Sequence, residues 1–206
     1  MISDPDILSD MHNTILFIDG ENFIFKLEQV LKRKKINLKE FDLSSARFDN
    51  LFAKVLQGLH IQKKLFYIAK LHVHKDDKEK SNELIEVQKK LSDTLTKQGF
   101  EIMFAGNVRS QTVRLKKETK IVFREKGVDV QIAVDLVSIA ADKGMQTAVL
   151  CSSDSDLQPA VKEVKKRGVE MIYLGFQMQP NKGLSYTSDR SILIQNADIL
   201  RACGLT

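Results

Sequence analysis

The sequence lacks long hydrophobic runs, a disulfide framework and a strong excess of either charge, and each absence excludes a class of protein. The longest apolar runs fall far short of the roughly 20 residues that a membrane-spanning helix needs. Residues 1–11 carry acids and neither a basic cluster nor an apolar core, so we expect no signal peptide. Cys151 and Cys203 are too few for a disulfide scaffold and indicate a reduced thiol in the cytosol.

Several catalytic patterns are also missing. The chain has no glycine-rich phosphate loop, no Ser–His–Asp set and no Cys–His pair. His72 and His74 lie close together, but no cysteine accompanies them, and the end of a surface strand explains them more simply than a zinc site does. The chemistry of this protein therefore has to be sought among other residue types.

The composition is that of a globular protein with a modest basic excess. A length of 206 residues, 43% hydrophobic and 29% charged, suits one domain with a full core. The net charge of +5 is concentrated, because residues 26–40 and 114–126 each hold six basic residues against two acids. Either segment alone is best explained as a solvated surface. Two of them beside acidic strand ends suit a polyanionic substrate.

Apolar strand-like runs alternate with helical patterns along the chain, which predicts βαβ units and a mainly parallel sheet flanked by helices. We expect a single domain over residues 13–206 after a lead-in of residues 1–12. The predicted strands are 14–19, 64–71, 100–105, 147–151 and 169–174, and the predicted helices are 22–34, 51–59, 76–98, 128–142 and 156–167.

Three further segments carry weaker patterns. Residues 112–125 partly alternate between apolar and polar, which predicts an antiparallel pair or a basic arm near residues 107–125. Residues 177–187 are rich in polar side chains and predict a loop. Residues 188–203 place apolar side chains at roughly helical spacing and predict a terminal helix.

The most informative feature is where the carboxylates fall. Asp19 ends one apolar run, Asp154 and Asp156 follow another, and Asp129 opens an apolar helix. In an α/β sheet, ligands bind at the carboxyl ends of the strands, so these acids are expected to converge. Crowded anions repel one another and require protons or a cation. Hard oxygen ligands of this kind favour Mg²⁺ or Mn²⁺.

Each acid or polar neighbour also has a simpler explanation. Asp19 could be a turn residue, and Asn22 could cap the following helix as readily as contact substrate or metal-bound water. Ser152 and Ser153 could cap a helix or orient a carboxylate. Asp135 lies on the flank of the 128–142 helix and is either a satisfied helix acid or a partner that supports the site from outside.

The 152–156 segment goes beyond what helix capping needs. A cap requires a single Asp or Ser. This segment supplies two Asp and three Ser directly after an apolar strand and before a helix. The helix N-terminus adds free N–H groups and the positive end of a dipole. The segment therefore favours a binding site over a simple cap.

In order and spacing, these motifs resemble the NYN domain family of PIN-like metal-dependent ribonucleases, in particular its bacterial LabA-like branch. The matching pieces are 17–22, 126–130 with Asp135, 152–157 and a late 196–198, and together they span roughly residues 13–201.

The resemblance implies a PIN-like, three-layer α/β fold with an acidic pocket for one or two Mg²⁺ or Mn²⁺ ions and cleavage of RNA phosphodiester bonds. Carried over, the acidic set would be Asp19, Asp129, Asp154 and Asp156, with Asn22 beside them. The chain departs from the family pattern at Ser153, where glycine is usual.

We therefore predict a cytosolic hydrolase, a divalent-metal-dependent ribonuclease acting on single-stranded RNA. Asp19 or Asp154 would orient or deprotonate the attacking water. The side chains expected to hold the RNA backbone are Lys116, Lys117, Lys120 and Arg124. No membrane partner is expected, and assembly into a homo-oligomer is left open.

Two other functions compete with this prediction. The first is a non-catalytic RNA-binding or regulatory NYN module that keeps the acids for structure or for a metal. The second is a small-molecule phosphohydrolase of the haloacid-dehalogenase type. That type requires Asp-x-Asp after its first strand, whereas Asp19 is followed by Gly20 and Glu21, which disfavours it.

Overall fold

The computed structural model describes residues 13–38, 41–73, 78–115 and 118–205, and for residues 107 and 109–125 it describes the course of the backbone. The predicted lead-in, residues 1–12, lies outside the described residues.

A seven-stranded sheet forms the centre of the described chain, in the order β4-β3-β2-β1-β5-β6-β7. Every neighbouring pair is parallel except β3 with β4. The prediction of a mainly parallel sheet is therefore confirmed. The strands are β1 Thr14–Asp19, β2 Ile61–Lys70, β3 Glu101–Leu115, β4 Glu118–Lys126, β5 Thr147–Cys151, β6 Glu170–Phe176 and β7 Arg190–Ile194.

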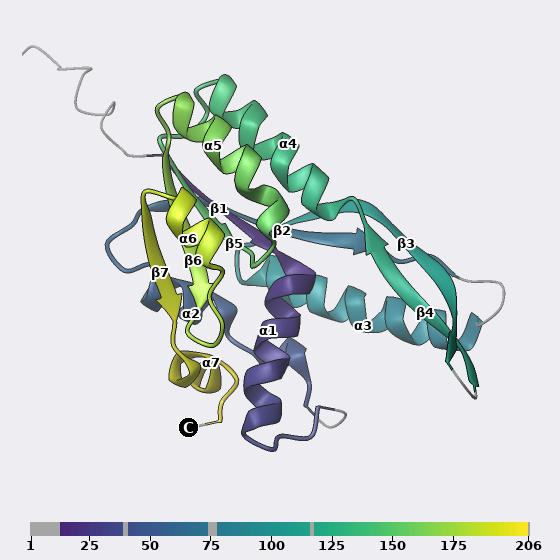
Figure 1. Ribbon diagram of the computed structural model, residues 1–206. Helices are drawn as coiled ribbons and strands as arrows, with labels where there is room; N and C mark the ends of the chain where they lie inside the picture. The colour runs from purple at the N-terminus through teal and green to yellow at the C-terminus, as the bar shows by residue number, and fades with distance from the viewer. Residues whose placement is uncertain (1–12, 39–40, 74–77, 116–117, 206) are drawn as a thin grey trace, which may run out of the picture.

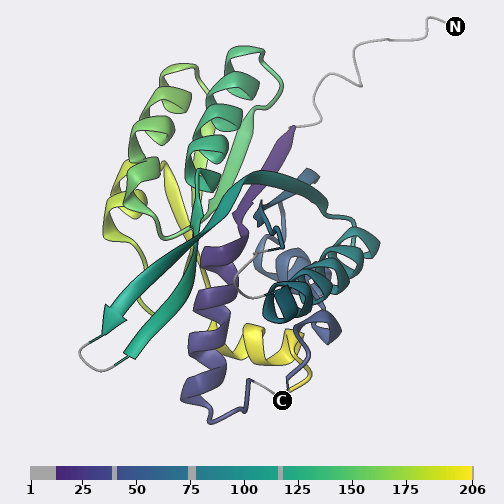
Figure 2. The same ribbon diagram turned by 90° about the vertical axis from the view of Figure 1, so that its right-hand side faces the viewer.

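Helices cover both faces of the sheet, which gives three layers (Figures 1 and 2). One face carries α1 Gly20–Arg33, α2 Phe48–Val55, α3 Lys78–Lys97 and α7 Asn196–Ala202. The other carries α4 Val128–Ala141, α5 Gln158–Lys166 and α6 Lys182–Thr187. Two short 3-10 helices, η2 Leu43–Ser45 and η3 Ser155–Leu157, complete the described elements. None of the described helices combines the length and apolar character needed to cross a bilayer.

Strand β1 is buried on both sides and divides the core in two. Leu16 and Ile18 face the layer that contains α1, whereas Ile15 and Phe17 face the layer that contains α4. A near-continuous apolar run is typical of a parallel strand covered on both faces. The first layer is rich in aromatic contacts centred on Phe23 of α1, whose ring meets four other phenylalanine rings at centroid distances of 5.3–6.2 Å.

The β3–β4 pair is an antiparallel hairpin that runs beyond the rest of the sheet (Figures 1 and 2). Its register extends from Asn107 opposite Lys126 to Leu115 opposite Glu118. Pairing of β3 with β2 ends at Asn107, so the outer part of the hairpin pairs only with itself among the described strands. The antiparallel alternative predicted for residues 112–125 is confirmed.

The C-terminal quarter differs from the prediction. Residues 177–187, predicted as a loop, contain helix α6, and residues 188–203, predicted as one helix, form strand β7 followed by the short helix α7. Residues 190–194 follow the period-two pattern of a strand rather than the helical pattern, because Ile192 and Ile194 both pack into the core beside β6. Both cysteines, Cys151 and Cys203, are buried and free of disulfides.

The strand order creates a switch point beside β1. The chain first builds β2, β3 and β4 on one side of β1 and then returns to build β5, β6 and β7 on the other side. Connections that leave β1 and β5 therefore pass to opposite faces of the sheet, and a crevice opens at their carboxyl ends. Asp19 ends β1 at this edge, and Ser152 directly follows β5 there.

Candidate functional site: an acidic cavity at the carboxyl edge of the sheet

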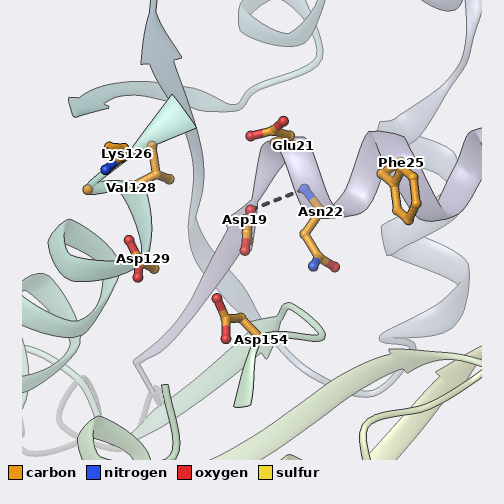
Figure 3. Close-up of a pocket in the computed structure, with 9 residues that line it drawn as sticks. Asp19, Glu21, Asn22, Phe25, Lys126, Val128, Asp129 and Asp154 are labelled. Atoms are coloured by element: carbon orange, nitrogen blue, oxygen red, sulfur yellow. Dashed lines mark hydrogen bonds between the residues drawn. The ribbon is translucent and has the colours of Figure 1, made fainter. Parts of the chain in front are cut away.

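A cavity of about 400 Å³ lies at this switch point. It brings together Asp19, Asp129 and Asp154, three of the four predicted acids, from three segments far apart in the sequence (Figure 3). The complete lining is Asp19, Glu21, Asn22, Phe25, Lys126, Gly127, Val128, Asp129 and Asp154.

Asp19 is held at the sheet edge by its own helix and by a serine from β5. It is only 9% exposed and caps α1 by accepting a hydrogen bond from the Asn22 backbone N–H at 3.2 Å. Its second oxygen accepts one from the Ser152 hydroxyl at 2.9 Å. Gly20 allows the helix to begin at once, because a Cβ there would lie 2.5 Å from the Tyr67 carbonyl oxygen. Asp19 is therefore both a cap and a cavity residue.

Ser152 connects Asp19 to Asp154. Its buried hydroxyl donates to Asp19 and accepts from the Asp154 backbone N–H at 3.0 Å. Asp154 in turn accepts from the Asp156 backbone N–H at 2.9 Å, which caps the following 3-10 turn. One hydroxyl therefore contacts both the Asp19 carboxylate and the backbone of Asp154.

Asn22 and Ser153 are bound to each other. The Asn22 side-chain oxygen accepts from both the backbone N–H and the hydroxyl of Ser153, each at 3.0 Å. A glycine at position 153, the residue usual in the resembled family, would lose the second of these bonds. The Ser153 carbonyl accepts from the Asn181 side chain at 2.8 Å, and the Asn181 backbone N–H donates to the Tyr173 hydroxyl. Sequence reasoning missed Asn181, whose role depends on a contact 28 residues away.

Asp129 approaches the cavity from the opposite wall (Figure 3). It lies in the first turn of α4, which begins after Gly127 at φ +90°. This left-handed conformation favours glycine and turns the chain sharply from β4 into α4. Lys126, the last residue of β4, also lines the cavity, so the hairpin leads directly into the site.

Asp135 and Asp156 lie outside the cavity lining. Asp135 accepts hydrogen bonds from the fully buried Tyr67 of β2 at 2.9 Å and from Gln131 of its own helix at 2.8 Å, so its carboxylate already has partners. Asp156 is exposed and lines a neighbouring, mostly apolar groove between α4 and α5, to which Asp129 also contributes. The structure therefore places Asp156 beside the acidic cavity rather than in it.

The predicted basic and C-terminal residues lie elsewhere. Lys116 and Lys117 fall outside the described residues, and Lys120 and Arg124 belong to β4 by their backbone. Asp198, in the last matching motif, pairs with Lys54 at 2.5 Å and lines a separate pocket that shares no residue with the acidic cavity.

Burial gives Asp19 unusual acid–base behaviour. Loss of hydration raises the pKa of its carboxyl from 3.8 to about 6, the hydrogen bonds from Asn22 and Ser152 oppose the rise, and the charges of Asp154 and Glu21 add to it. None of the three cavity aspartates forms an ion pair with a lysine or arginine of the described residues. Within the described part of the chain these carboxylates therefore lack a paired cation, although Lys126 also lines the cavity.

The oxygen ligands of these carboxylates have the chemistry that suits a hard divalent ion. Their separation, however, is larger than a ready-made metal site requires. Among the described residues, no three His, Cys, Asp or Glu side chains lie near enough to hold a metal ion as they stand. Mg²⁺ typically keeps several waters and binds through one or two carboxylates plus substrate phosphate. A spread set of unpaired carboxylates fits that mode and does not fit a closed, all-protein site such as structural zinc.

Comparison with known proteins decides the family. The model of the NYN domain matches residues 13–195, which is most of the chain. The chain belongs to the NYN domain family. NYN domains are PIN-like nucleases, so family and fold agree with the resemblance found in the motifs. The LabA-like branch within the NYN family stays a prediction.

The other comparisons support the fold and no further property of the chain. No curated protein matches the chain. A crystal structure of a protein of unknown function from Vibrio parahaemolyticus is similar, with 20% identity and a TM-score of 0.55 over 90% of this chain and 95% of that one.

Five lining residues of this NYN domain were absent from the predicted site: Glu21, Phe25, Lys126, Gly127 and Val128. A signal for two of them was present in the sequence. Glu21 directly follows the Asp19-Gly20 pair. Phe25 lies three residues beyond Asn22, and this spacing places Asn22 and Phe25 on one face of a helix.

Proposed function

We propose that this NYN domain is a divalent-metal-dependent ribonuclease that hydrolyses phosphodiester bonds of single-stranded RNA in the acidic cavity. The observation that carries the proposal is the meeting of Asp19, Asp129 and Asp154 around one cavity, without a cationic partner among the described residues, in a member of a nuclease family. A cytosolic location is part of the proposal and rests on the two free, buried cysteines.

Asp19, Asp129 and Asp154 would hold Mg²⁺ or Mn²⁺. Such an ion, when bound, polarises a phosphate oxygen and acidifies water. The residues of the chain supply position and charge around it. Ser152 would hold the Asp19 carboxylate and the backbone of Asp154 through its two hydrogen bonds. Lys126 on the cavity rim offers a positive charge to the phosphate backbone.

Asp19 is suited to accept the proton of the attacking water. Its side chain lines the cavity beside the position proposed for the phosphate, which is where a general base has to lie. In the hydrolysis, the water oxygen bonds to phosphorus, its proton passes to Asp19, and the bond between phosphorus and the leaving oxygen breaks. The leaving oxygen takes a proton from solvent. Asp156, outside the cavity, would act on this step only indirectly through the Asp154 cap.

The basic positions of the hairpin would bind RNA away from the scissile bond. Lys120 and Arg124 belong to β4 by their backbone and precede Lys126 on the same strand. Lys116 and Lys117 complete the proposed set. Each such contact contributes about one unit to the salt slope of RNA binding.

Cleavage of end-labelled single-stranded RNA with Mn²⁺ tests the function. Asp154→Asn should cut at least about a hundredfold more slowly than wild type, since it removes one of three carboxylates around the reacting phosphate. Asp93→Asn, on the exposed side of α3, is the matched control and should cut at the wild-type rate. Equal cleavage by Asp154→Asn and wild type would overturn the assignment.

One observation favours a second function, a non-catalytic RNA-binding module: the described acids are too far apart to form a ready-made metal group. The two functions differ in a simple measurement. A binding module retains labelled RNA in an electrophoretic shift but leaves it intact in Mn²⁺ even with protein in large excess.

A further inference from the structure

A second cavity adjoins the acidic one and has the opposite character. Its volume is about 420 Å³, and it lies between α1 and α3 at the end of β2. Apolar side chains such as Ile24, Leu84, Val87 and Leu91 form most of its lining. The two cavities share Glu21 and Phe25, so an extended ligand can pass from one to the other without leaving the protein surface.

Phe25 stands at the junction. Its side chain is 52% exposed, and in Figure 3 it lies at the end of the acidic cavity away from Lys126 and Asp129. Phe23, two residues earlier on the same helix, is fully buried and contacts four other rings. Phe25 contacts no aromatic ring of the described residues. An exposed ring of this kind adds nothing to the core and is available to a ligand.

The walls of the apolar cavity are fixed rather than loosely placed. The Gln88 side chain of α3 donates to the Ala69 carbonyl of β2 at 2.9 Å, which ties the helix to the strand end. Glu21 and Glu28 lie on the α1 side. Their carboxylates disfavour a phosphate backbone along this wall. Apolar surface with acidic edges instead suits nucleobases, whose faces stack and whose amino groups donate hydrogen bonds to carboxylates.

We propose that Phe25 is a stacking platform for a nucleobase of the single-stranded RNA whose neighbouring phosphate occupies the acidic cavity. The apolar cavity takes the bases that follow. This inference rests on the proposed function for the placement of that phosphate. It also specifies the substrate, because a base in a duplex is already stacked between its neighbours and cannot lie on Phe25.

Fluorescence anisotropy in Ca²⁺ tests the platform, since Ca²⁺ also takes oxygen ligands. Phe25→Ala should weaken binding of a labelled oligoadenylate about tenfold, the change that stacking of one base gives. Phe25→Leu should weaken it less. Tyr186→Ala is the control, since Tyr186 is 92% exposed on α6 and lines neither cavity. It should bind as wild type does.

Two modified oligonucleotides distinguish base stacking on Phe25 from attraction of the phosphate charge. An abasic oligonucleotide of equal length and charge should bind wild type and Phe25→Ala equally, and 2-aminopurine in the oligoadenylate should be quenched by wild type alone. If Phe25→Ala binds the oligoadenylate as tightly as wild type does, the proposal is overturned. The apolar cavity would then be assigned to a protein segment instead of nucleobases. An equal loss for the abasic probe would also overturn it. Circular dichroism melting verifies that the variants fold.

The stacking platform and the ribonuclease activity can be refuted independently of each other. Base-dependent binding that requires Phe25, with no cleavage in Mn²⁺, supports the platform and refutes the ribonuclease. Cleavage with an unchanged KM in Phe25→Ala supports the ribonuclease and refutes the platform.

Discussion

Replacing Asp19 with asparagine should stabilise the metal-free protein at neutral pH, although it alters a residue proposed to be essential. Folding raises the pKa of Asp19 from 3.8 to about 6 because the carboxyl loses hydration. The folded state therefore binds the proton more tightly than the unfolded state. The stability that this group contributes is fully present below about pH 4 and is lost as pH rises through 6.

The pKa difference sets the size of the effect. At pH 7.5, ionised Asp19 costs about 3 kcal/mol of folding free energy, and roughly half of that cost is already present at pH 5. Asparagine carries no charge and keeps one oxygen for the Asn22 backbone N–H. It gives up the carboxylate acceptor of Ser152, a loss of about 1 kcal/mol. The net gain should be about 2 kcal/mol at pH 7.5 and about 0.5 kcal/mol at pH 5.

Urea unfolding followed by circular dichroism, with EDTA present, measures this gain. The stability difference between Asp19→Asn and wild type should grow as pH rises from 5 to 7.5. Asp93→Asn provides the control and should show no such growth. A difference that stays constant over this range, or a variant less stable at pH 7.5, would refute the view that Asp19 is a buried, uncompensated carboxylate.

Three further predictions follow from the site and its supports. Mn²⁺ at 100 times its dissociation constant should add about 2.7 kcal/mol to wild-type stability, visible by calorimetry as a higher Tm, and Asp19→Asn should remove most of that rise. Gly20→Ala should destabilise the protein by about 3 kcal/mol in urea, because its Cβ would clash with the Tyr67 carbonyl; an unchanged midpoint would contradict this close approach. Tyr67→Phe should cost about 1–2 kcal/mol by removing the hydrogen bond to Asp135, while RNA cleavage should stay within a few-fold of wild type.

The sheet was predictable where strands are buried on both faces. Residues 14–19 and 147–151 form strands with the predicted bounds, because continuous apolar runs bounded by polar turns leave little choice. Residues 188–203 were predicted wrongly as one helix. Apolar side chains there fit period two and period 3.6 almost equally, and pairing with β6, which the local sequence does not reveal, decides the outcome.

The site was predictable to the extent that topology alone determines it. Convergence of Asp19, Asp129 and Asp154 follows from strand ends and a helix start at one edge of the sheet. Asp156 follows Asp154 by two residues and still lies outside the cavity lining, because the 3-10 turn directs it to the neighbouring groove. The contact of Asn181 with Ser153 joins segments distant in sequence, which no local pattern encodes.

The direct passage from β4 into α4 restricts where chain length can vary. One residue inserted between Lys126 and Asp129 would shift the start of the helix by about 100° and turn the Asp129 carboxylate out of the cavity. Residues inserted at the far end of the hairpin, between β3 and β4, leave that junction untouched. We therefore expect the length of the hairpin to tolerate more variation than the spacing at 126–129, which positions Asp129.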